Sequence, residues 1–267
     1  MTRSEKQVAS FFLGHLNSFA FSTLDSLASQ IGTSTTSVIR FCRKIGFTGF
    51  KGFQDALRGE IMCQPSLPVK FERTMKEFIG DDLLAQTLQQ DIHCLEKTFL
   101  EMPPSILADA VQRLCNARRV FTFGLKESMA LAHYAFTRFM TVRDDVFILG
   151  ANNGCVEAIH SLSPDDICIL FLFHRYTRET LRLLPLIKNT NVQILLITNP
   201  PYENISTYAD LILPCYMDAH GIKNTSIAPI CLLDYLCNAV ALQKGEDAIA
   251  RMKQLEKLIQ NSEILGS

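Results

Sequence analysis

The sequence has no apolar segment long enough to cross a membrane. Its longest uninterrupted apolar run, Ile167 to Phe173, covers seven residues, whereas a membrane-spanning helix needs about 20. The amino-terminal residues also lack the charged-then-apolar pattern of a secretion signal. We therefore expect a cytoplasmic protein that does not associate with membranes.

Charged residues are too few for an intrinsically disordered chain. They make up 20% of the 267 residues, while hydrophobic residues make up 48%, which is enough apolar material for packed cores. A chain of this length exceeds the usual size of one domain. We expect two folded domains, one small and one larger.

Paired cysteines are absent as well. None of the nine cysteines forms a Cys-x-x-Cys pair, and no cysteine and histidine pairs repeat at the spacing of a zinc site. Single cysteines are among the residues most often buried in protein cores. We expect reduced, mostly buried thiols, no metal and no cofactor. Cys42, which has basic neighbours, leaves a redox role open.

Three short amphipathic segments follow one another near the amino terminus. Apolar residues recur at helical spacing over residues 8–19 and again over residues 24–31, where Thr23 is a typical helix N-cap. Gly32 suits the end of the second helix, and Ser34 can cap a third only two residues later. This close succession predicts a helix-turn-helix.

The third helical segment has one apolar and one basic face. At about 100° per residue, the apolar face consists of Val38, Phe41, Cys42 and Ile45. The opposite face has no acidic residue, and Gly46 closes the helix. This pattern is typical of a recognition helix in the major groove of DNA, although spacing alone leaves open a merely solvated basic face. The residues that we expect to contact DNA are Ser34, Thr36, Ser37, Arg40, Arg43, Lys44 and Lys51.

The segment from Ser34 to Phe53, STTSVIRFCRKIGFTGFKGF, resembles the signature of the RpiR (MurR) family of bacterial transcriptional regulators. That pattern runs Ser, two variable residues, Thr or Ser, Val, then Arg-Phe, Lys, Gly-Phe and Gly-Phe. Ser4-Glu5-Lys6 and Leu27-Ala28 match the same family, so the resemblance covers the whole domain. It implies a double-stranded DNA operator as partner.

Prolines mark the connection to the second domain. Pro65 and Pro68 interrupt the helical pattern. A long amphipathic helix is expected over residues 83–99, and the Pro103-Pro104 pair ends it. Ser105 is the expected cap of the next helix. The expected parts are a helix-turn-helix domain at residues 1–77, a linker helix at 78–106 and a second domain at 107–267.

Short β-branched and aromatic runs alternate with helical segments after Arg119. The strand candidates are Val120–Phe123, Val146–Leu149, Ile167–Phe173, Ile194–Thr198 and Leu211–Leu213. Their intervals fit βαβ crossovers, which predicts a three-layer, flavodoxin-like α/β domain with a five-stranded, mostly parallel sheet. The aspartates that precede strands are interpreted as solvated turn residues at the edge away from any ligand: Asp144, Asp145, Asp165 and Asp166.

Ligands of such sheets bind beyond the carboxyl ends of the strands, where helix N-termini attract anions. Two loops there have the strand, small polar turn and helix arrangement that can cradle a phosphate. They follow the first and the third expected strand, at residues 124–128 and 173–180, and are called the first and the third loop. His174 lies in the third loop and His220 in the loop after the last strand. Either histidine could instead be a solvent-exposed residue without a role in binding. The expected effector contacts are Gly124, Lys126, Glu127, Ser128, His174, Arg175, Thr177, Thr180 and His220.

The first loop is similar to that of the SIS (sugar isomerase) domain, which in the RpiR family follows the helix-turn-helix and binds phosphosugars. The SIS pattern reads Gly-x-Gly-x-Ser. Gly124 and Ser128 match it, whereas Lys126 replaces the second glycine.

The third loop departs further from its SIS pattern, Ser-x-Ser-Gly-x-Thr-x-Glu-Thr. It retains Thr177, Glu179 and Thr180. The residues that stand in place of Ser, Ser and Gly are Leu172, His174 and Arg175. Basic residues of the loops could replace the lost hydroxyl contacts by charge-assisted bonds and keep an anionic effector, either a phosphosugar or a carboxylate. Alternatively, the site is vestigial.

Specific DNA binding calls for more than one chain. One recognition helix reads only a few base pairs, so we expect a symmetric homo-oligomer on two half-sites. The resemblance implies a dimer or tetramer.

Two other functions stay open. The first is a phosphosugar isomerase or lyase, whose acid or base candidates are Glu127, Glu179, His174 and His220, although they form no recognisable dyad. The second is a ligand-free oligomeric scaffold, with Phe171, Phe173 and Tyr176 filling the pocket. The helix-turn-helix and the altered loop favour a regulator that is not an enzyme.

Overall fold

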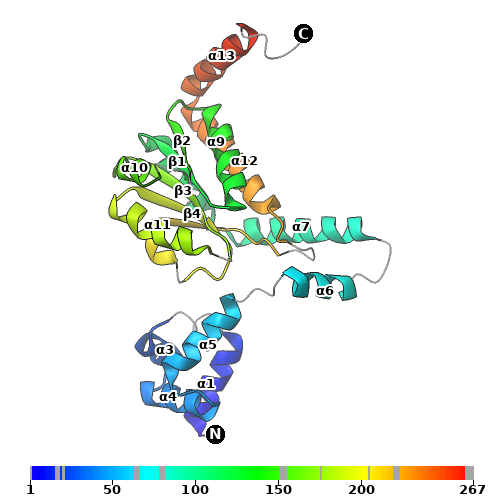
Figure 1. Cartoon of the computed structure of the whole chain (residues 1–267), viewed down its shortest axis with the longest axis vertical. Helices are drawn as coiled ribbons and strands as arrows, with labels where there is room; N and C mark the ends of the chain where they lie inside the picture. The colour runs from blue at the N-terminus through cyan, green and yellow to red at the C-terminus, as the bar shows by residue number, and fades with distance from the viewer. Residues whose placement is uncertain are drawn as a thin grey trace. The chain divides into compact units, whose positions relative to one another are not determined.

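The computed structural model describes residues 2–15, 19, 22–62, 67–77, 82–150, 155–174, 176–203, 205–218 and 223–261. The chain divides into two compact units, residues 1–66 and 67–267, which are treated separately below (Figure 1). The boundary expected at residue 77 comes one helix later than this division. The helix over residues 67–77 joins the second unit, where its Lys70 Nζ donates a hydrogen bond of 2.7 Å to Asn224 Oδ1.

The first unit is a bundle of short helices. They are α1 (Arg3–Gly14), α3 (Leu24–Ile31), α4 (Thr35–Lys44) and α5 (Phe50–Met62). The predicted turn between α3 and α4 is confirmed: Thr23 and Ser34 accept hydrogen bonds as N-caps, and Gly32 ends α3 with a φ of 72°. Glycine adopts this left-handed conformation without steric cost.

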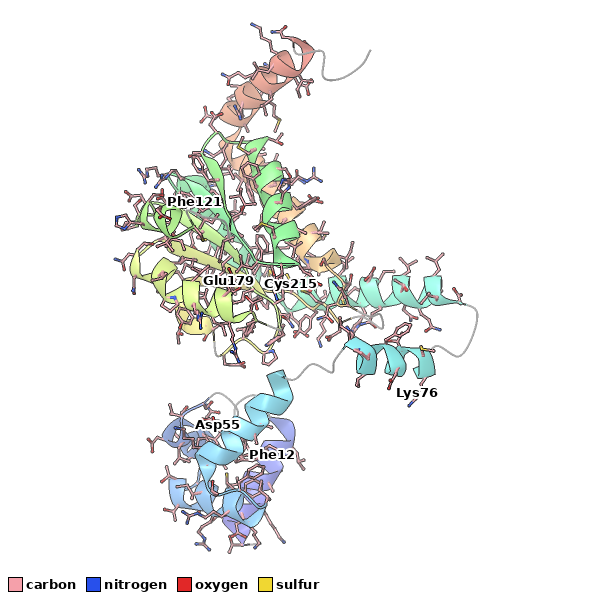
Figure 2. All side chains as sticks on the ribbon, in the orientation of Figure 1. Phe12, Asp55, Lys76, Phe121, Glu179 and Cys215 are labelled. Atoms are coloured by element: carbon pink, nitrogen blue, oxygen red, sulfur yellow. The ribbon has the colours of Figure 1, made fainter. Side chains whose placement is uncertain are left out.

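Aromatic side chains fill the core of this unit. Phe12, Phe19, Phe41 and Phe53 lie with ring centroids 5.2 to 6.5 Å apart, and Figure 2 labels Phe12. The predicted apolar face of α4 is confirmed for Val38, Phe41 and Cys42, which are buried. Ile45 is an exception at 39% exposure, because α4 ends one residue before it.

Helices make up most of the second unit outside its sheet. Their bounds are α6 (Leu67–Glu77), α7 (Leu83–Glu101), α8 (Pro104–Asn116), α9 (Ser128–Met140), α10 (Cys155–His160), α11 (Arg178–Asn189), the short 3-10 helix η1 (Ser206–Tyr208), α12 (Ile227–Lys244) and α13 (Glu246–Asn261). Ser105 does not cap α8 as predicted: the N-cap is Pro103, and Pro104 takes the first position, where its missing N–H costs nothing.

The sheet has five strands in the order β2-β1-β3-β4-β5, and every neighbouring pair is parallel. The strands are β1 (Val120–Phe123), β2 (Val146–Leu149), β3 (Ile167–Phe171), β4 (Gln193–Thr198) and β5 (Leu211–Pro214). This confirms the predicted flavodoxin-like α/β fold. Strand β3 is two residues shorter than predicted, because its register with β4 ends at Phe171 and the next residues turn into the loop.

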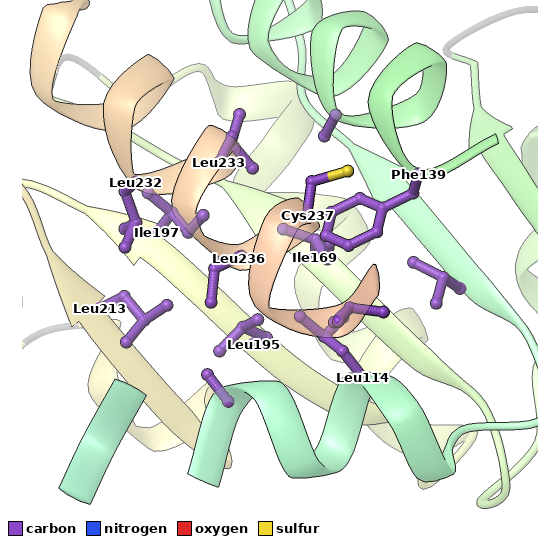
Figure 3. Close-up of a cluster of buried hydrophobic side chains, with 14 of the residues drawn as sticks. Leu114, Phe139, Ile169, Leu195, Ile197, Leu213, Leu232, Leu233, Leu236 and Cys237 are labelled. Carbon is purple, nitrogen blue, oxygen red and sulfur yellow. The ribbon is translucent and has the colours of Figure 1, made fainter. Parts of the chain in front are cut away.

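Both faces of the sheet are covered by helices. Along β3, Ile167, Ile169 and Phe171 face one buried cluster that includes residues of α8, α9 and α12. Cys168 and Leu170 face another, which includes residues of α10 and α11. Figure 3 shows α12 over the first face, with Leu232, Leu233 and Leu236 near Ile169, Leu195 and Ile197. Burial on both sides explains why β3 is apolar throughout.

The described part of the chain contains no helix that is both long and apolar enough to cross a membrane. Cysteines are mostly buried, as predicted: of the eight that the structure describes, six are buried, and Cys115 and Cys231 are the more accessible ones.

Asp166 corrects one prediction. It precedes β3 as expected, but it is fully buried and not a solvated turn residue. Its carboxylate accepts hydrogen bonds of 2.7 to 3.1 Å from Arg118, Arg119 and Ser163. Burial alone would raise the pKa of Asp166, but these hydrogen bonds outweigh it and hold the pKa well below its ordinary value.

Replacing Asp166 by Asn should destabilise the protein by about 2 kcal/mol at pH 7, since several charge-assisted hydrogen bonds are lost. The carboxylate stabilises the fold above its unfolded pKa of about 4 and loses this effect as the pH falls toward the depressed folded pKa. Urea unfolding should therefore show the difference shrinking by about 1 kcal/mol at pH 3.

The exposed neighbour Asp165 provides the matched control. Asp165→Asn should stay within about 0.5 kcal/mol of the unmodified protein at both pH values. An Asp166→Asn cost that does not change with pH would contradict the assigned pKa direction.

Candidate DNA-binding face and effector site

Helix α4, the predicted recognition helix, is placed by the tight turn that precedes it. The amide of Thr33 donates to the carbonyl of Ala28 at 2.9 Å, which closes the end of α3. Ser34 Oγ then accepts a hydrogen bond of 3.2 Å from the Ser37 amide and lies 3.0 Å from Ser37 Oγ. Both serines predicted to contact DNA therefore also build the N-cap of α4.

Most of the predicted DNA-contacting side chains belong to α4, and Lys51 lies in the first turn of α5. Ser37 is half-buried, and the exposed ones are Ser34, Thr36, Arg40, Arg43, Lys44 and Lys51. Arg43 Nε donates a long hydrogen bond of 3.4 Å to the carbonyl of Thr48, which orients it toward the loop between α4 and α5. The result is an accessible face of basic and hydroxyl side chains.

Lys44 has a protein partner that the sequence did not reveal. Its Nζ lies 2.9 Å from Glu5 Oε2, and the Glu5 side chain is only 7% exposed. This hydrogen bond and that of the Thr2 amide lower the pKa of Glu5, and Glu5 raises the pKa of Lys44. Since Glu5 offsets the charge of Lys44, Arg40 and Arg43 supply most of the uncompensated charge on α4.

The redox role left open for Cys42 does not fit its surroundings. Its side chain is fully buried in the core of the first unit, and burial raises its pKa to about 11. A thiol with such a pKa is protonated near neutral pH and is a poor nucleophile.

The predicted effector loops leave the sheet at one edge, beside each other. Strand β1 pairs with both β2 and β3, so the chain order reverses between β1 and β3. The loops after these two strands therefore flank the topological switch point, where ligands of doubly wound sheets bind.

The first loop is wound so tightly that it needs Gly124. A Cβ atom at this position would lie 2.4 Å from the carbonyl oxygen of Ser128. Lys126, which stands where the SIS pattern has its second glycine, has a φ of 54°. The loop keeps a left-handed conformation typical of glycine while it carries a lysine.

The open end of α9 lies in this loop. The amides of Ser128, Met129 and Ala130 donate to carbonyls three residues earlier at 3.1 Å. The amides of Lys126 and Glu127 lie at the open end, where the helix dipole favours an anion. The side chains of Lys126 and Glu127 are exposed, and Ser128 is half-buried.

The third loop is held by its own side chains. The His174 amide donates to Asn199 Oδ1 at 3.0 Å, and His174 Nε2 lies 3.0 Å from the hydroxyl of Tyr176. Burial lowers the pKa of His174 and raises that of Tyr176, so a neutral imidazole is favoured near neutral pH. Leu172, at a position where the SIS pattern has serine, is buried.

The two threonines of the third loop start α11. Thr177 Oγ1 accepts a hydrogen bond of 3.1 Å from the Thr180 amide and lies 2.8 Å from Thr180 Oγ1. The Thr180 side chain is buried at 2% exposure. Both hydroxyls therefore serve as a helix cap, a role that the sequence prediction did not give them.

Two predicted contacts, Arg175 and His220, lie outside the described residues. Two residues not predicted do reach this edge: Asn199 directly follows β4, and Lys223 forms an ion pair with Glu127. The position of Asn199 just after a strand could have marked it, whereas no local pattern marks Lys223. Among the residues that the structure describes, no cluster of His, Cys, Asp or Glu side chains is arranged to hold a metal ion.

Comparison with known proteins agrees with this division of the chain. Residues 1–64 match the family model of the helix-turn-helix domain, rpiR family, and residues 113–238 match that of the SIS domain. An uncharacterised HTH-type transcriptional regulator of Haemophilus influenzae is 27% identical over 265 residues, which cover 95% of this chain and 90% of the relative.

Solved structures share the fold. NanR of Vibrio vulnificus, solved in complex with ManNAc-6P, has a TM-score of 0.63 and 17% identity, covering 100% of this chain and 96% of NanR. The sugar isomerase domain of an RpiR transcription factor from Sphaerobacter thermophilus has a TM-score of 0.62 and 21% identity, covering 66% of this chain and 99% of that domain. The chain belongs to the RpiR family of helix-turn-helix transcriptional regulators, with a helix-turn-helix domain followed by a SIS domain.

Proposed function

We propose that this regulator binds operator DNA in the cytoplasm as a homo-oligomer, through α4, and that a phosphosugar bound at the carboxyl edge of its sheet controls this binding. The observation that carries the proposal is the pair of loops after β1 and β3, which flank the switch point of the sheet. We also propose that the protein binds the phosphosugar without converting it.

Operator binding rests on the exposed face of α4. Arg40 and Arg43 are exposed there, and arginine forms bidentate hydrogen bonds with guanine edges or phosphates. Lys51 lies in the first turn of α5, from which it can reach the DNA backbone. One such helix covers only part of an operator, so two chains on two half-sites supply the specificity.

Effector binding rests mainly on the first loop. Gly124 keeps the turn tight, the N-terminus of α9 faces the loop, and Lys126 adds a positive charge that the SIS pattern lacks. In the third loop, the side chains of Thr177, Thr180 and His174 already bond within the protein. A phosphosugar is the favoured effector class because V. vulnificus NanR, of the same fold, binds ManNAc-6P.

An isomerase or lyase activity is less well supported by the candidate acids and bases. Glu127 is ion-paired with Lys223 and His174 is bonded to Tyr176. Of the other two candidates, Glu179 is exposed in the first turn of α11, and His220 lies outside the described residues. Sugar isomerisation needs an acid or base free to reach the substrate. Purified protein should therefore leave phosphosugars unconverted, as NMR of the mixture can measure.

A ligand-free scaffold is also less well supported. Phe171 is buried in the sheet and does not fill the loop edge. Phe173 packs against one core and Tyr176 against the other, so these three side chains do not fill the pocket as a single cluster.

Operator binding can be tested by replacing Arg40. Arg40→Ala should weaken binding to DNA from upstream of the protein's own coding region by about 10- to 100-fold, because one bidentate contact contributes about 1–3 kcal/mol. Fluorescence anisotropy over a salt series measures this, with scrambled duplex as the reference.

The controls replace two lysines of the same unit. Lys6→Ala, an exposed change on α1 outside the predicted face, should leave the affinity unaltered. Lys44→Ala should lower thermal stability more than affinity, because it removes the bond to Glu5. If the unmodified protein and Arg40→Ala bind the upstream DNA with equal affinity, the assignment of α4 as recognition helix is wrong.

The effector loop can be tested with Lys126→Gly. Relief of the left-handed conformation should stabilise the protein by about 0.5–1 kcal/mol, while loss of the positive charge should weaken the response of DNA binding to an anion. Urea unfolding measures the first effect. Anisotropy with ManNAc-6P, glucose 6-phosphate, fructose 6-phosphate and citrate measures the second.

Asn191→Gly is the matched control, since Asn191 also has a positive φ, of 58°, but asparagine tolerates it. This variant should change neither stability nor response appreciably. If Lys126→Gly raises stability and leaves the response intact, the loop is left-handed but does not supply the effector contact.

A further inference from the structure

Two consecutive residues after β5 connect the effector loop to the helix that follows the DNA-binding unit. Lys223 forms an ion pair with Glu127, the N-cap residue of α9. Asn224 accepts a hydrogen bond of 2.7 Å from Lys70 of α6. The residues Glu127, Lys223, Asn224 and Lys70 thus form a continuous path, and the path reaches α6 only a few residues after the first unit ends at residue 66.

The chain just before this path is firmly attached to α7. The Tyr216 amide donates to Thr98 Oγ1 at 2.9 Å. Cys94 Sγ and Gln90 Nε2 both donate to the Asp218 carbonyl at 3.0 Å. Cys94 and Thr98 are buried, so residues 215–218 have a fixed support on α7.

The path itself is held by weaker, solvent-exposed contacts. The side chains of Lys223 and Glu127 are 57% and 72% exposed, and an ion pair of such exposure is easily exchanged. Helix α6 also buries little apolar surface of its own, since Leu67, Phe71 and Met75 are 44%, 44% and 64% exposed. The bond from Lys70 to Asn224 is therefore one of the contacts that hold α6 in place.

We propose that the Glu127–Lys223 pair is a latch that connects occupancy of the effector loop to helix α6. This inference rests on the proposed function. An anion at the open end of α9 competes with the Glu127 carboxylate for the Lys223 ammonium, because a phosphate monoester carries more negative charge than a carboxylate. As Lys223 turns to the anion, the adjacent Asn224 shifts, and the hydrogen bond that it accepts from Lys70 weakens.

The latch makes Lys223 and Asn224 positioning residues for the regulatory response. Release of α6 changes how the DNA-binding unit is tethered, which alters operator affinity without any contact between effector and DNA. An exposed ion pair can shift such an equilibrium by up to about fivefold, enough for a graded response.

Hydrogen exchange of the full-length protein tests the latch. In Glu127→Gln and in Asn224→Ala, amide exchange over residues 67–77 should be about two- to fivefold faster than in the unmodified protein. The charge swap Glu127→Lys with Lys223→Glu should restore the original rate. Lys188→Met is the matched control, because it breaks the 2.7 Å ion pair with Asp210 in the same unit and should leave α6 unaffected.

The effect of an anion is read in the same assay. Inorganic phosphate or glucose 6-phosphate added to the unmodified protein should accelerate exchange in α6 and should have no effect in Lys223→Met. Unaltered exchange of α6 in both Glu127→Gln and Asn224→Ala would overturn the latch. If exchange is faster in these variants but neither anion accelerates it in the unmodified protein, the proposal that an anion opens the latch is overturned.

Operator binding separates this inference from the proposed function. If the unmodified protein does not prefer its upstream DNA to scrambled duplex, the proposed function fails whatever α6 does. If it does, Glu127→Gln and Asn224→Ala should shift operator affinity about two- to fivefold in the same direction with no compound present. Identical operator affinities in all three proteins would again overturn the latch.

Discussion

The pairing of β1 with strands on both of its sides is the constraint on which the second unit depends. Because β1 lies between β2 and β3, the chain leads from β1 to β2 on one side and from β3 to β4 on the other. Two loops and the N-terminus of α9 therefore meet at one point, with helices covering both faces of the sheet. An anion can bind there without any additional element, because the backbone of the loops and of the helix N-terminus forms the site.

In the first unit, packing decides which charges remain for DNA. The basic side chains of α4 are equivalent in the sequence pattern, yet Glu5 of α1 offsets Lys44, whereas Arg40 stays exposed. A carboxylate that is nearly buried requires such a partner, because burying it unpaired would be costly. The same contact joins α1 to α4, so the stability of this unit and the shape of the proposed DNA-binding face are linked.

Sequence patterns predicted the elements well where one physical signal dominated. The strands are mostly apolar, with β3 buried on both faces, and the caps Thr23, Gly32 and Ser34 have strong local preferences. Predictions failed where the surroundings of a side chain depend on residues far away in the sequence. Asp166 is buried by Arg118 and Arg119, and Lys223 meets Glu127 from 96 residues away. Neither pairing leaves a periodic or local trace.

The altered SIS loops show why a lost motif need not mean a lost site. In the third loop, buried Leu172 and the bond between His174 and Tyr176 replace hydroxyl groups that could have turned to a ligand. In the first loop, Lys126 keeps the left-handed backbone of the missing glycine and adds a charge at the same edge. In the proposed site, recognition would rely less on hydroxyl hydrogen bonds and more on charge attraction, which discriminates less by shape. Such a site gains its selectivity from what the anion displaces, and Glu127, already bound to Lys223, is the group that an anion at α9 must displace.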